Sequence, residues 1–191
     1  MKVNSSAMNR HDSQTARLTQ ILDELLFASR LDAGLSDVVL AECDPAPLAE
    51  DVARLQRTRL TPEQALTVEA ADDLPRVRCD PERLRQVLVN LLDNAIKYSP
   101  DGGDITISLE AGGQVVRISV ADQGLGIPPA ERERIFEKFY RLDPTLRRGV
   151  GGTGLGLYIS RQYISQMGGR LWVESSRRPG STFHIELRIA G

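Results

Sequence analysis

The sequence is poor in cysteine and in net charge, and each shortage excludes a class of protein. Only two of its 191 residues are cysteines, Cys43 and Cys79, and they form no C-x-x-C motif. A disulfide framework or a structural zinc site is therefore not expected, and two small buried thiols in a reducing compartment fit better. The net charge of −2 lacks the basic excess that a dedicated nucleic-acid-binding protein needs.

The sequence also lacks a long apolar run. No segment approaches the roughly 18 consecutive apolar residues of a membrane-spanning helix, and no signal peptide precedes the first expected helix. We therefore expect no direct membrane insertion by this chain. Hydrophobic residues make up 41% and charged residues 26% of the sequence, which is typical of a globular protein with one substantial core.

The N-terminal part predicts a short leader followed by one helix. Residues 1–14 are polar, and leucines such as Leu22 and Leu25 then recur at heptad-like intervals over residues 15–33. Gly34 follows as the expected end of this helix. Its apolar stripe needs a partner helix, so we expect packing on another chain, with a homodimer through residues 15–33 as one possibility.

Residues 38–191 predict an α+β fold in which a mixed sheet and helices on one of its faces form a two-layer sandwich. Runs of strands interrupted by a few helices favour this class. Asp80 is the expected N-cap of the central helix, with Pro81 at its first position. The expected elements are strand 38–43, helix 45–57, strands 65–70 and 76–80, helix 81–97, strands 105–111 and 115–122, a short helix near Glu131, a helix from the glycine-rich stretch to about Met167, and strands 170–176 and 181–187.

The stretch 149–159, GVGGTGLGLYI, contains a G-x-G-x-x-G frame at Gly149, Gly151 and Gly154. A dinucleotide-binding fingerprint needs a strand directly before its first glycine, but a charged loop, RLDPTLRR, precedes this one. A P-loop needs a lysine after the glycines, and none follows. Both familiar glycine-rich sites are therefore excluded, and a mobile loop before a helix is the simplest alternative.

An anion site at the start of the following helix remains possible. We expect Thr153 to cap a helix beginning near Gly154, whose unpaired N–H groups and positive dipole end favour a phosphate. Arg147 and Arg148 lie just upstream and would add charge-assisted contacts.

A second cluster lies in NLLDNAIKYSP, residues 90–100. Asn90 and Asn94 share a helix face, and Lys97 lies about one turn further along it. Amide oxygens suit Mg²⁺ and an ammonium suits phosphate, which makes the trio a candidate metal and phosphate site. The alternative is a pair of satisfied surface amides.

A third cluster, DQGLGIP, directly follows an expected strand. Gly124 and Gly126 allow a tight loop with close access to the backbone. The Asp122 carboxylate can accept a hydrogen bond from an exocyclic amine such as that of adenine, whereas guanine presents an oxo group there. The alternative is an ordinary turn.

A fourth cluster, IFEKFYR, concentrates aromatic residues before the glycine-rich stretch. Phe136, Phe139 and Tyr140 are expected to form an aromatic anchor. The segment Arg141–Gly151 would then be a movable lid hinged on that anchor. The alternative is a hydrophobic plug under a loop.

In this order, the four clusters resemble the motifs of the catalytic and ATP-binding domain of sensor histidine kinases. DPERLRQVLVNLLDNAIKYSP resembles the N box, DQGLGIP the first glycine box, FEKFYR the F box and GGTGLGL the second glycine box. The match covers about residues 38–191 and implies a Bergerat-type fold. RLTQILDELLFASRLDAG, in segment 15–34, resembles the second helix of the dimerisation and phosphoacceptor hairpin, whose first helix is absent.

The resemblance implies ATP and Mg²⁺ as cofactors. Asn94 would coordinate Mg²⁺ and Asn90 would support the metal and the phosphates. Lys97 would contact phosphate, and the lid cations Arg147 and Arg148 would assist in neutralising the transferred group. The remaining nucleotide-binding residues that it implies are Tyr98 near the adenosine, Asp122 at the adenine amine, and Gly124, Gly126, Ile127, Gly152, Thr153, Gly154, Leu155 and Gly156 in the two loops.

The sequence departs from the family at the phosphoacceptor. The histidine of the family lies on the first hairpin helix in a pattern like S-H-E-L-R-T-P, and nothing here matches. His11 lies in the polar leader, and a structural role is favoured for His184 on the last strand. The acceptor is therefore expected on another chain or in a missing segment.

Asn90 indicates a subclass within the wider superfamily. The related gyrase-like and chaperone ATPases have a glutamate at this position that activates water. A carboxamide cannot be a general base, so we expect slow intrinsic ATP hydrolysis.

The leading hypothesis is a protein-histidine kinase domain of a bacterial two-component system that donates the γ-phosphoryl group to a histidine on another segment or chain. A response regulator would be its downstream partner, nucleic acid would not bind, and the location would be cytoplasmic. The alternatives are a serine/threonine kinase of the anti-sigma type, which usually has a glutamate in place of Asn90, and a non-catalytic nucleotide sensor.

Overall fold

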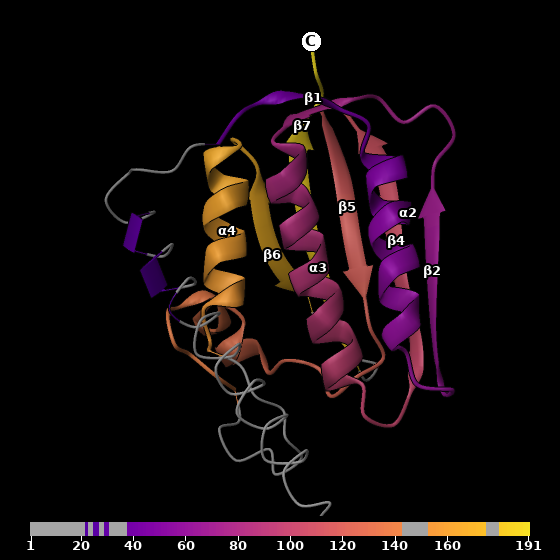
Figure 1. Cartoon of the computed structure of the whole chain (residues 1–191), viewed down its shortest axis with the longest axis vertical. Coiled ribbons are helices and arrows are strands. Elements are labelled where there is room, and N and C mark those ends of the chain that lie inside the picture. Colours follow the sequence, from indigo (N-terminus) through magenta and orange to yellow (C-terminus); the bar gives the residue numbers. More distant parts are fainter. Residues whose placement is uncertain (1–21, 23–24, 27–28, 31–37, 143–152, 175–179) are drawn as a thin grey trace, which may run out of the picture. The chain divides into compact units, whose positions relative to one another are not determined.

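A computed structural model describes residues 38–142, 153–174 and 180–191, together with residues 22, 25, 26, 29 and 30 (Figure 1). The chain divides into two units, residues 1–37 and 38–191. In the first unit the described residues are helical, and the side chains of Leu22 and Leu26 are 58% and 60% exposed. The described part of this unit therefore exposes apolar side chains.

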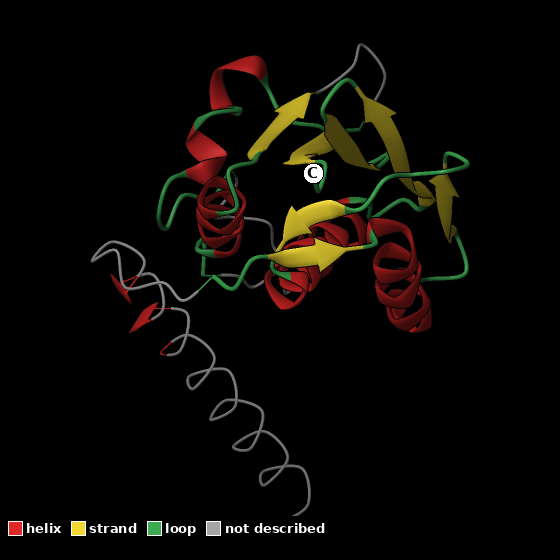
Figure 2. Ribbon diagram, turned by 90° about the horizontal axis from the view of Figure 1, so that it is seen from above, coloured by secondary structure: helices red, strands yellow, loops and turns green. Residues whose placement is uncertain are grey.

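The second unit is a five-stranded mixed sheet with three helices on one face (Figures 1 and 2). The strand order is β2-β4-β5-β7-β6; β2 and β4 run parallel, and the other neighbours are antiparallel. The predicted α+β class is confirmed. The sheet strands are β2 (Gln64–Ala70), β4 (Gly103–Gly112), β5 (Val115–Ala121), β6 (Arg170–Glu174) and β7 (Thr182–Arg188), and the helices are α2 (Pro45–Gln56), α3 (Pro81–Tyr98) and α4 (Gly156–Gln166).

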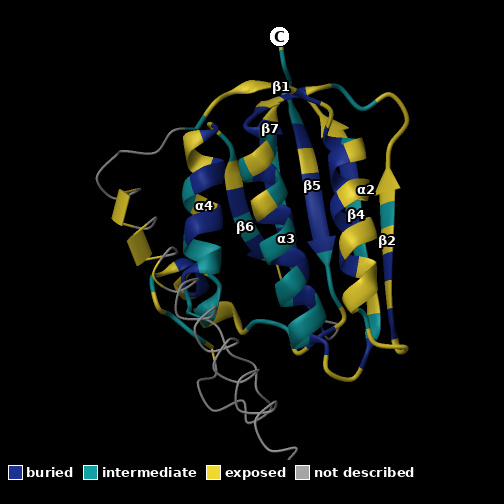
Figure 3. Ribbon diagram, in the orientation of Figure 1, coloured by how far each residue is buried: buried dark blue, intermediate teal, exposed yellow. Residues whose placement is uncertain are grey.

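The core lies between the sheet and the helices (Figure 3). Along β4 the side chains alternate, so that Ile105, Ile107 and Leu109 are fully buried and their neighbours Thr106 and Ser108 are only half-buried. This period of two is what a sheet covered on one face requires. The same alternation continues in β7 and, apart from the buried Ser119, in β5, which places one apolar layer under the helices.

α3 is the central helix, and its start follows from local chemistry. The Asp80 side chain accepts hydrogen bonds from the N–H groups of Glu82 and Arg83 at 3.0 and 3.2 Å, and Pro81 occupies the first helical position. Both predictions for this helix start are confirmed. Such a cap is worth about 1 kcal/mol.

A separate two-stranded sheet joins β1 (Ala41–Cys43) to β3 (Val77–Cys79). It holds both cysteines, which are free and buried. Burial raises the pKa of both thiols, that of Cys79 to about 12. Neither is therefore a ready thiolate nucleophile.

Several expected elements differ from the observed ones. The short helix expected near Glu131 is present as two 3₁₀ helices, η2 (Pro129–Glu131) and η3 (Arg134–Phe136). The strands expected at 38–43 and 76–80 are shorter in the structure, with three residues each: β1 and β3 pair with one another, and Val77 of β3 also bridges to Ile189. Among the described residues, no helix is both long and apolar enough to cross a membrane.

Candidate functional site

α3 carries polar side chains on the face that does not pack into the core. Asn90, Asn94 and Lys97 follow one another at helical spacing and are all half-buried. The side chains of α3 that fill the core are Leu84, Val87, Leu88, Leu91, Leu92 and Ala95. The predicted amide–amide–ammonium row therefore lies at the edge of the core, where solvent and a ligand can reach it.

Asn90 joins this row to α4. Its Nδ2 donates a hydrogen bond to Oγ of Ser160 at 3.0 Å. Its Oδ1 lies beside Gly156, where an added Cβ would come within 2.4 Å of that oxygen. The two helices are antiparallel, since Arg83 near the start of α3 lies over the ring of Tyr163 near the end of α4. The C-terminal half of α3 thus faces the first turn of α4.

Asp122 lies directly after β5, at the same end of the sheet. Its Oδ1 accepts hydrogen bonds from the N–H groups of Gly124 and Ser181 at 2.8 and 3.2 Å. Its own N–H donates to the Ser181 carbonyl at 2.9 Å. The carboxylate is therefore anchored through one oxygen, which leaves Oδ2 to accept from a ligand.

Burial raises the pKa of the Asp122 carboxyl, and the N–H groups of Gly124 and Ser181 partly offset this effect. A raised pKa indicates a carboxylate withdrawn from water, which strengthens any hydrogen bond that it accepts.

The loop after Asp122 is bound to the end of α3. Gly124 packs so closely that an added Cβ would lie 2.2 Å from the Tyr98 carbonyl oxygen. The next residue, Leu125, donates its N–H to that same oxygen at 3.1 Å. Gly126 has a φ of +72°, which favours glycine. These contacts join the first glycine loop to the amide row of α3.

The side chains of Lys97 and Tyr98, at the end of α3, lie close together. Nζ of Lys97 is 4.9 Å from the centroid of the Tyr98 ring. Ile127 is half-buried in the first glycine loop.

The second glycine loop approaches the aromatic segment. Gly154 has a φ of +73°, and an added Cβ would lie 2.7 Å from the Phe139 carbonyl carbon. Its carbonyl accepts the Phe139 N–H at 3.0 Å. Only glycine fits this position, because both the backbone conformation and the space exclude a side chain.

The prediction that Thr153 caps a helix starting near Gly154 is wrong. α4 begins at Gly156, with Leu155 as its N-cap residue, and within the described chain no side chain caps it. The Thr153 hydroxyl instead accepts the Leu155 N–H at 3.2 Å and closes a short turn. Leu155 is fully buried, so packing rather than a cap fixes the first turn. The uncapped N–H groups of that turn favour an anion.

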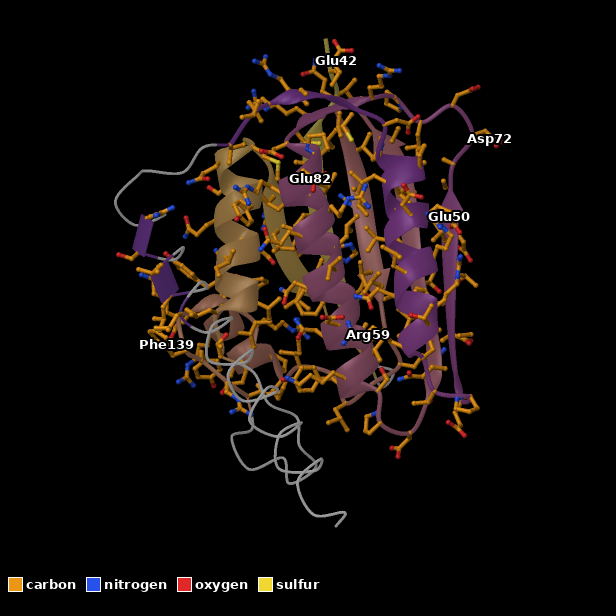
Figure 4. All side chains as sticks on the ribbon, in the orientation of Figure 1. Glu42, Glu50, Arg59, Asp72, Glu82 and Phe139 are labelled. Carbon is orange, nitrogen blue, oxygen red and sulfur yellow. The ribbon has the colours of Figure 1, made fainter. Side chains whose placement is uncertain are left out.

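The aromatic anchor is correct only in part. Phe136 is buried and packs edge-on against Phe183, with ring centroids 6.4 Å apart. Tyr140 donates its hydroxyl hydrogen to Glu131. Phe139 is 58% exposed with a φ of +63°, so it is not part of the anchor. It lies at the same end as the first turn of α4 (Figure 4).

Sequence reasoning missed three residues at this end. Ser160 holds Asn90, and the backbone of Ser181 holds Asp122. Gly180 has a φ of +121°, and an added Cβ would lie 2.0 Å from the Asp122 carbonyl oxygen. The Pro-Gly-Ser turn before the last strand was the available signal for Gly180, but nothing local links it to Asp122.

Several predicted residues lie outside the described part of the chain, namely Arg147, Arg148, Gly152 and His11. His184 is described and lies on the sheet face opposite the helices. Its Nδ1 is 2.8 Å from the Ser119 hydroxyl and its ring stacks on Trp172. Burial lowers its pKa. These contacts agree with the structural role predicted for His184.

The site therefore combines, at one end of the sheet, a half-buried acceptor, two amides, an ammonium and an uncapped helix start. An acceptor fits a base amine, amide oxygens fit a hard cation, and the positive groups fit phosphates. Among the described residues no cluster of three or more His, Cys, Asp or Glu side chains could hold a metal. A divalent cation here would thus depend on the amides and on the ligand itself.

Comparisons with known proteins agree with this chemistry. Residues 79–191 match the family of histidine kinase-, DNA gyrase B- and HSP90-like ATPases. The adaptive-response sensory kinase SasA of Thermosynechococcus vestitus is 39% identical over 181 residues, which cover 93% of this chain and 47% of that protein. The sensor histidine kinase AruS of Pseudomonas aeruginosa is 40% identical over 182 residues, or 91% of this chain and 18% of that protein. The chain spans about half the length of SasA, and less of AruS.

Solved structures share the architecture as well. Full-length ShkA in complex with AMPPNP superposes with a TM-score of 0.83 at 31% identity, over 100% of this chain and 41% of that one. Histidine kinase ThkA, in complex with the response regulator protein TrrA, has a TM-score of 0.76 at 26% identity, over 99% of this chain and 52% of that one.

Proposed function

The chain belongs to the family of histidine kinase-, DNA gyrase B- and HSP90-like ATPases, and we propose that it is the ATP-binding catalytic part of a bacterial sensor histidine kinase. The observation that carries this proposal is the meeting of three separate segments at one end of the sheet: the amide row of α3, Asp122 after β5, and the start of α4. Base, metal and phosphates of one nucleotide would each find a matching group there. The relatives named as sensory kinases favour this function over a sensor without catalysis.

Asp122 would bind the adenine base through a hydrogen bond. Its Oδ1 is already engaged by two backbone N–H groups, so Oδ2 is the oxygen that accepts from the exocyclic amine. Guanine presents an oxo group at that position and would face the carboxylate with a second acceptor. Tyr98 and the first glycine loop, with Gly124, Gly126 and Ile127, would flank the adenosine.

Asn94 and Asn90 fit Mg²⁺ through their amide oxygens. Within the described residues the Asn94 side chain makes no hydrogen bond, which leaves it available as a ligand. A bound Mg²⁺ would offset charge on the phosphates. Lys97 would contact the phosphates from α3, and the second glycine loop, Gly152 to Gly156, would meet them with the N–H groups of α4. Arg147 and Arg148 would add positive charge.

The reaction would be transfer of the γ-phosphoryl group to a histidine on a phosphoacceptor hairpin in trans. The bond between the γ-phosphorus and the bridging oxygen breaks, a phosphorus–nitrogen bond to the imidazole forms, and ADP leaves. Catalysis would rest on positioning and charge neutralisation. Asn90 has no basic group, so water would be a poor competitor for the phosphoryl group.

The partners follow from the same proposal. A response regulator would receive the phosphoryl group from the hairpin, and ThkA has been solved in complex with such a protein. The exposed leucines of residues 15–33 would pack on a second hairpin helix or on another copy of this chain. Such a kinase domain would work on the cytoplasmic side of a membrane.

The test incubates the chain with [γ-³²P]ATP and Mg²⁺, with and without a separate phosphoacceptor hairpin. The proposal expects an acid-labile, base-stable label on the hairpin that disappears in an Asn94→Ala variant. Gln86→Ala is the matched control, because Gln86 is exposed on the same helix. Nucleotide binding without transfer would instead support a sensor, and an acid-stable label would support a serine/threonine kinase.

A further inference from the structure

Asn90 is held by a side chain that lies outside the four sequence clusters. Ser160, in the second turn of α4, accepts the hydrogen bond of Asn90 Nδ2 at 3.0 Å, from 70 positions away in the chain. Ser160 is 2% exposed. The hydroxyl is therefore not a surface group, and it accepts a hydrogen bond from a residue of the candidate metal site.

The orientation of a carboxamide depends on such a partner. The group has two donors at one end and an acceptor at the other, in nearly the same shape, so packing alone does not decide which end faces a ligand. A serine hydroxyl can accept or donate, and here it accepts from Nδ2, so Oδ1 is the end that remains for a cation. Without this bond the half-buried amide is free to rotate.

The first turn of α4 supplies the second constraint. Gly156 lies four residues before Ser160, on the same side of α4, and an added Cβ there would come within 2.4 Å of Asn90 Oδ1. The bare Cα leaves just enough room for this oxygen beside the uncapped helix start. One helix thus holds the nitrogen of the carboxamide and accommodates its oxygen.

We propose that Ser160 is a positioning residue that fixes the Asn90 carboxamide with Oδ1 toward the metal and phosphate site. This inference rests on the proposed nucleotide site. It assigns Ser160 a role in coupling Mg²⁺ to nucleotide binding, without contact to either. It also makes that coupling depend on the packing of α4 against α3, since the hydroxyl belongs to one helix and the amide to the other.

The experiment measures the affinity for AMPPNP in Mg²⁺ and in EDTA by isothermal titration calorimetry. In Ser160→Ala we expect unchanged affinity in EDTA and a loss of about three- to tenfold in the enhancement by Mg²⁺, the size of one hydrogen bond. Ser160→Thr keeps the hydroxyl and should restore the enhancement. Ser165→Ala, at an exposed position on the same helix, should behave as wild type.

A double-mutant cycle separates positioning from general stability. In an Asn90→Ala background, Ser160→Ala should have no further effect on the enhancement, because nothing is left to position. Equal losses in Mg²⁺ and EDTA, or an unchanged enhancement in Ser160→Ala, would overturn the inference while the nucleotide site stands. A wild-type chain whose affinity ignores Mg²⁺ would overturn the proposed metal site and this inference together.

Discussion

Replacing Asp122 by asparagine separates the two roles of its carboxylate. The amide oxygen of an asparagine keeps the two hydrogen bonds from Gly124 and Ser181, at 2.8 and 3.2 Å, because the side chains have the same shape. The NH₂ group then takes the place of Oδ2. An adenine amine would meet a donor in place of an acceptor.

The substitution should weaken ATP binding without lowering the free energy of unfolding. In the variant the adenine amine loses a hydrogen bond to a charged acceptor and lies against the NH₂ group of the asparagine. We expect this change to cost about 2–4 kcal/mol of binding free energy, so the affinity for ATP should fall roughly 30- to 1000-fold. The pKa of the Asp122 carboxyl is raised above 3.8, chiefly by burial. The carboxyl group therefore makes its full contribution to the free energy of unfolding at pH values below 3.8. This contribution is lost as the pH rises through the raised pKa. At pH 7 the neutral asparagine should leave the free energy of unfolding unchanged or higher.

Two assays check this pair of effects. Calorimetric titration with ATP gives the affinity, and urea unfolding between pH 4 and 8 gives the stability. The stability difference between variant and wild type should grow with pH and then level off. Asp104→Asn, at an exposed position on β4, is the matched control. An Asp122→Asn protein that binds ATP like wild type would refute the adenine assignment, and one that is less stable at pH 7 would refute the argument from burial.

Three further predictions concern other parts of the chain. Gly154→Ala should weaken nucleotide binding, because the added Cβ would meet Phe139. It should also lower the free energy of unfolding by about 1 kcal/mol or more, the cost of a left-handed non-glycine residue. Urea unfolding that matches wild type would contradict this. The purified chain should release phosphate from ATP only slowly, since Asn90 is no base; brisk release that is lost in Asn90→Ala would argue against it. Leu25→Glu should reduce self-association of the chain, since Leu25 and Leu22 are exposed apolar side chains of one helix; sedimentation equilibrium checks this, and a wild-type monomer at all concentrations would disprove it.

More of the fold than of the site could be predicted from the sequence. The α+β class, the strands of the main sheet and the start of α3 at Asp80 follow from signals within a few residues of each position. Helix α3 shows the reason: its leucine spacing and its cap act through neighbouring turns, which any window of the sequence contains. The sequence also predicted a short helix near Glu131, but not that it would be divided into two 3₁₀ helices with Ile135 and Phe136 buried.

Within the site, the sequence by itself determined which residue types stand in the four clusters and at what spacing. It placed Asn90, Asn94 and Lys97 on one helix face. Only the tertiary structure decided that Asn90 meets Ser160 and that Asp122 meets Ser181, 70 and 59 positions apart. It also decided that Phe139 is exposed. Contacts across such distances depend on how α3, α4 and the last strands pack together, and no local pattern of side chains encodes that packing.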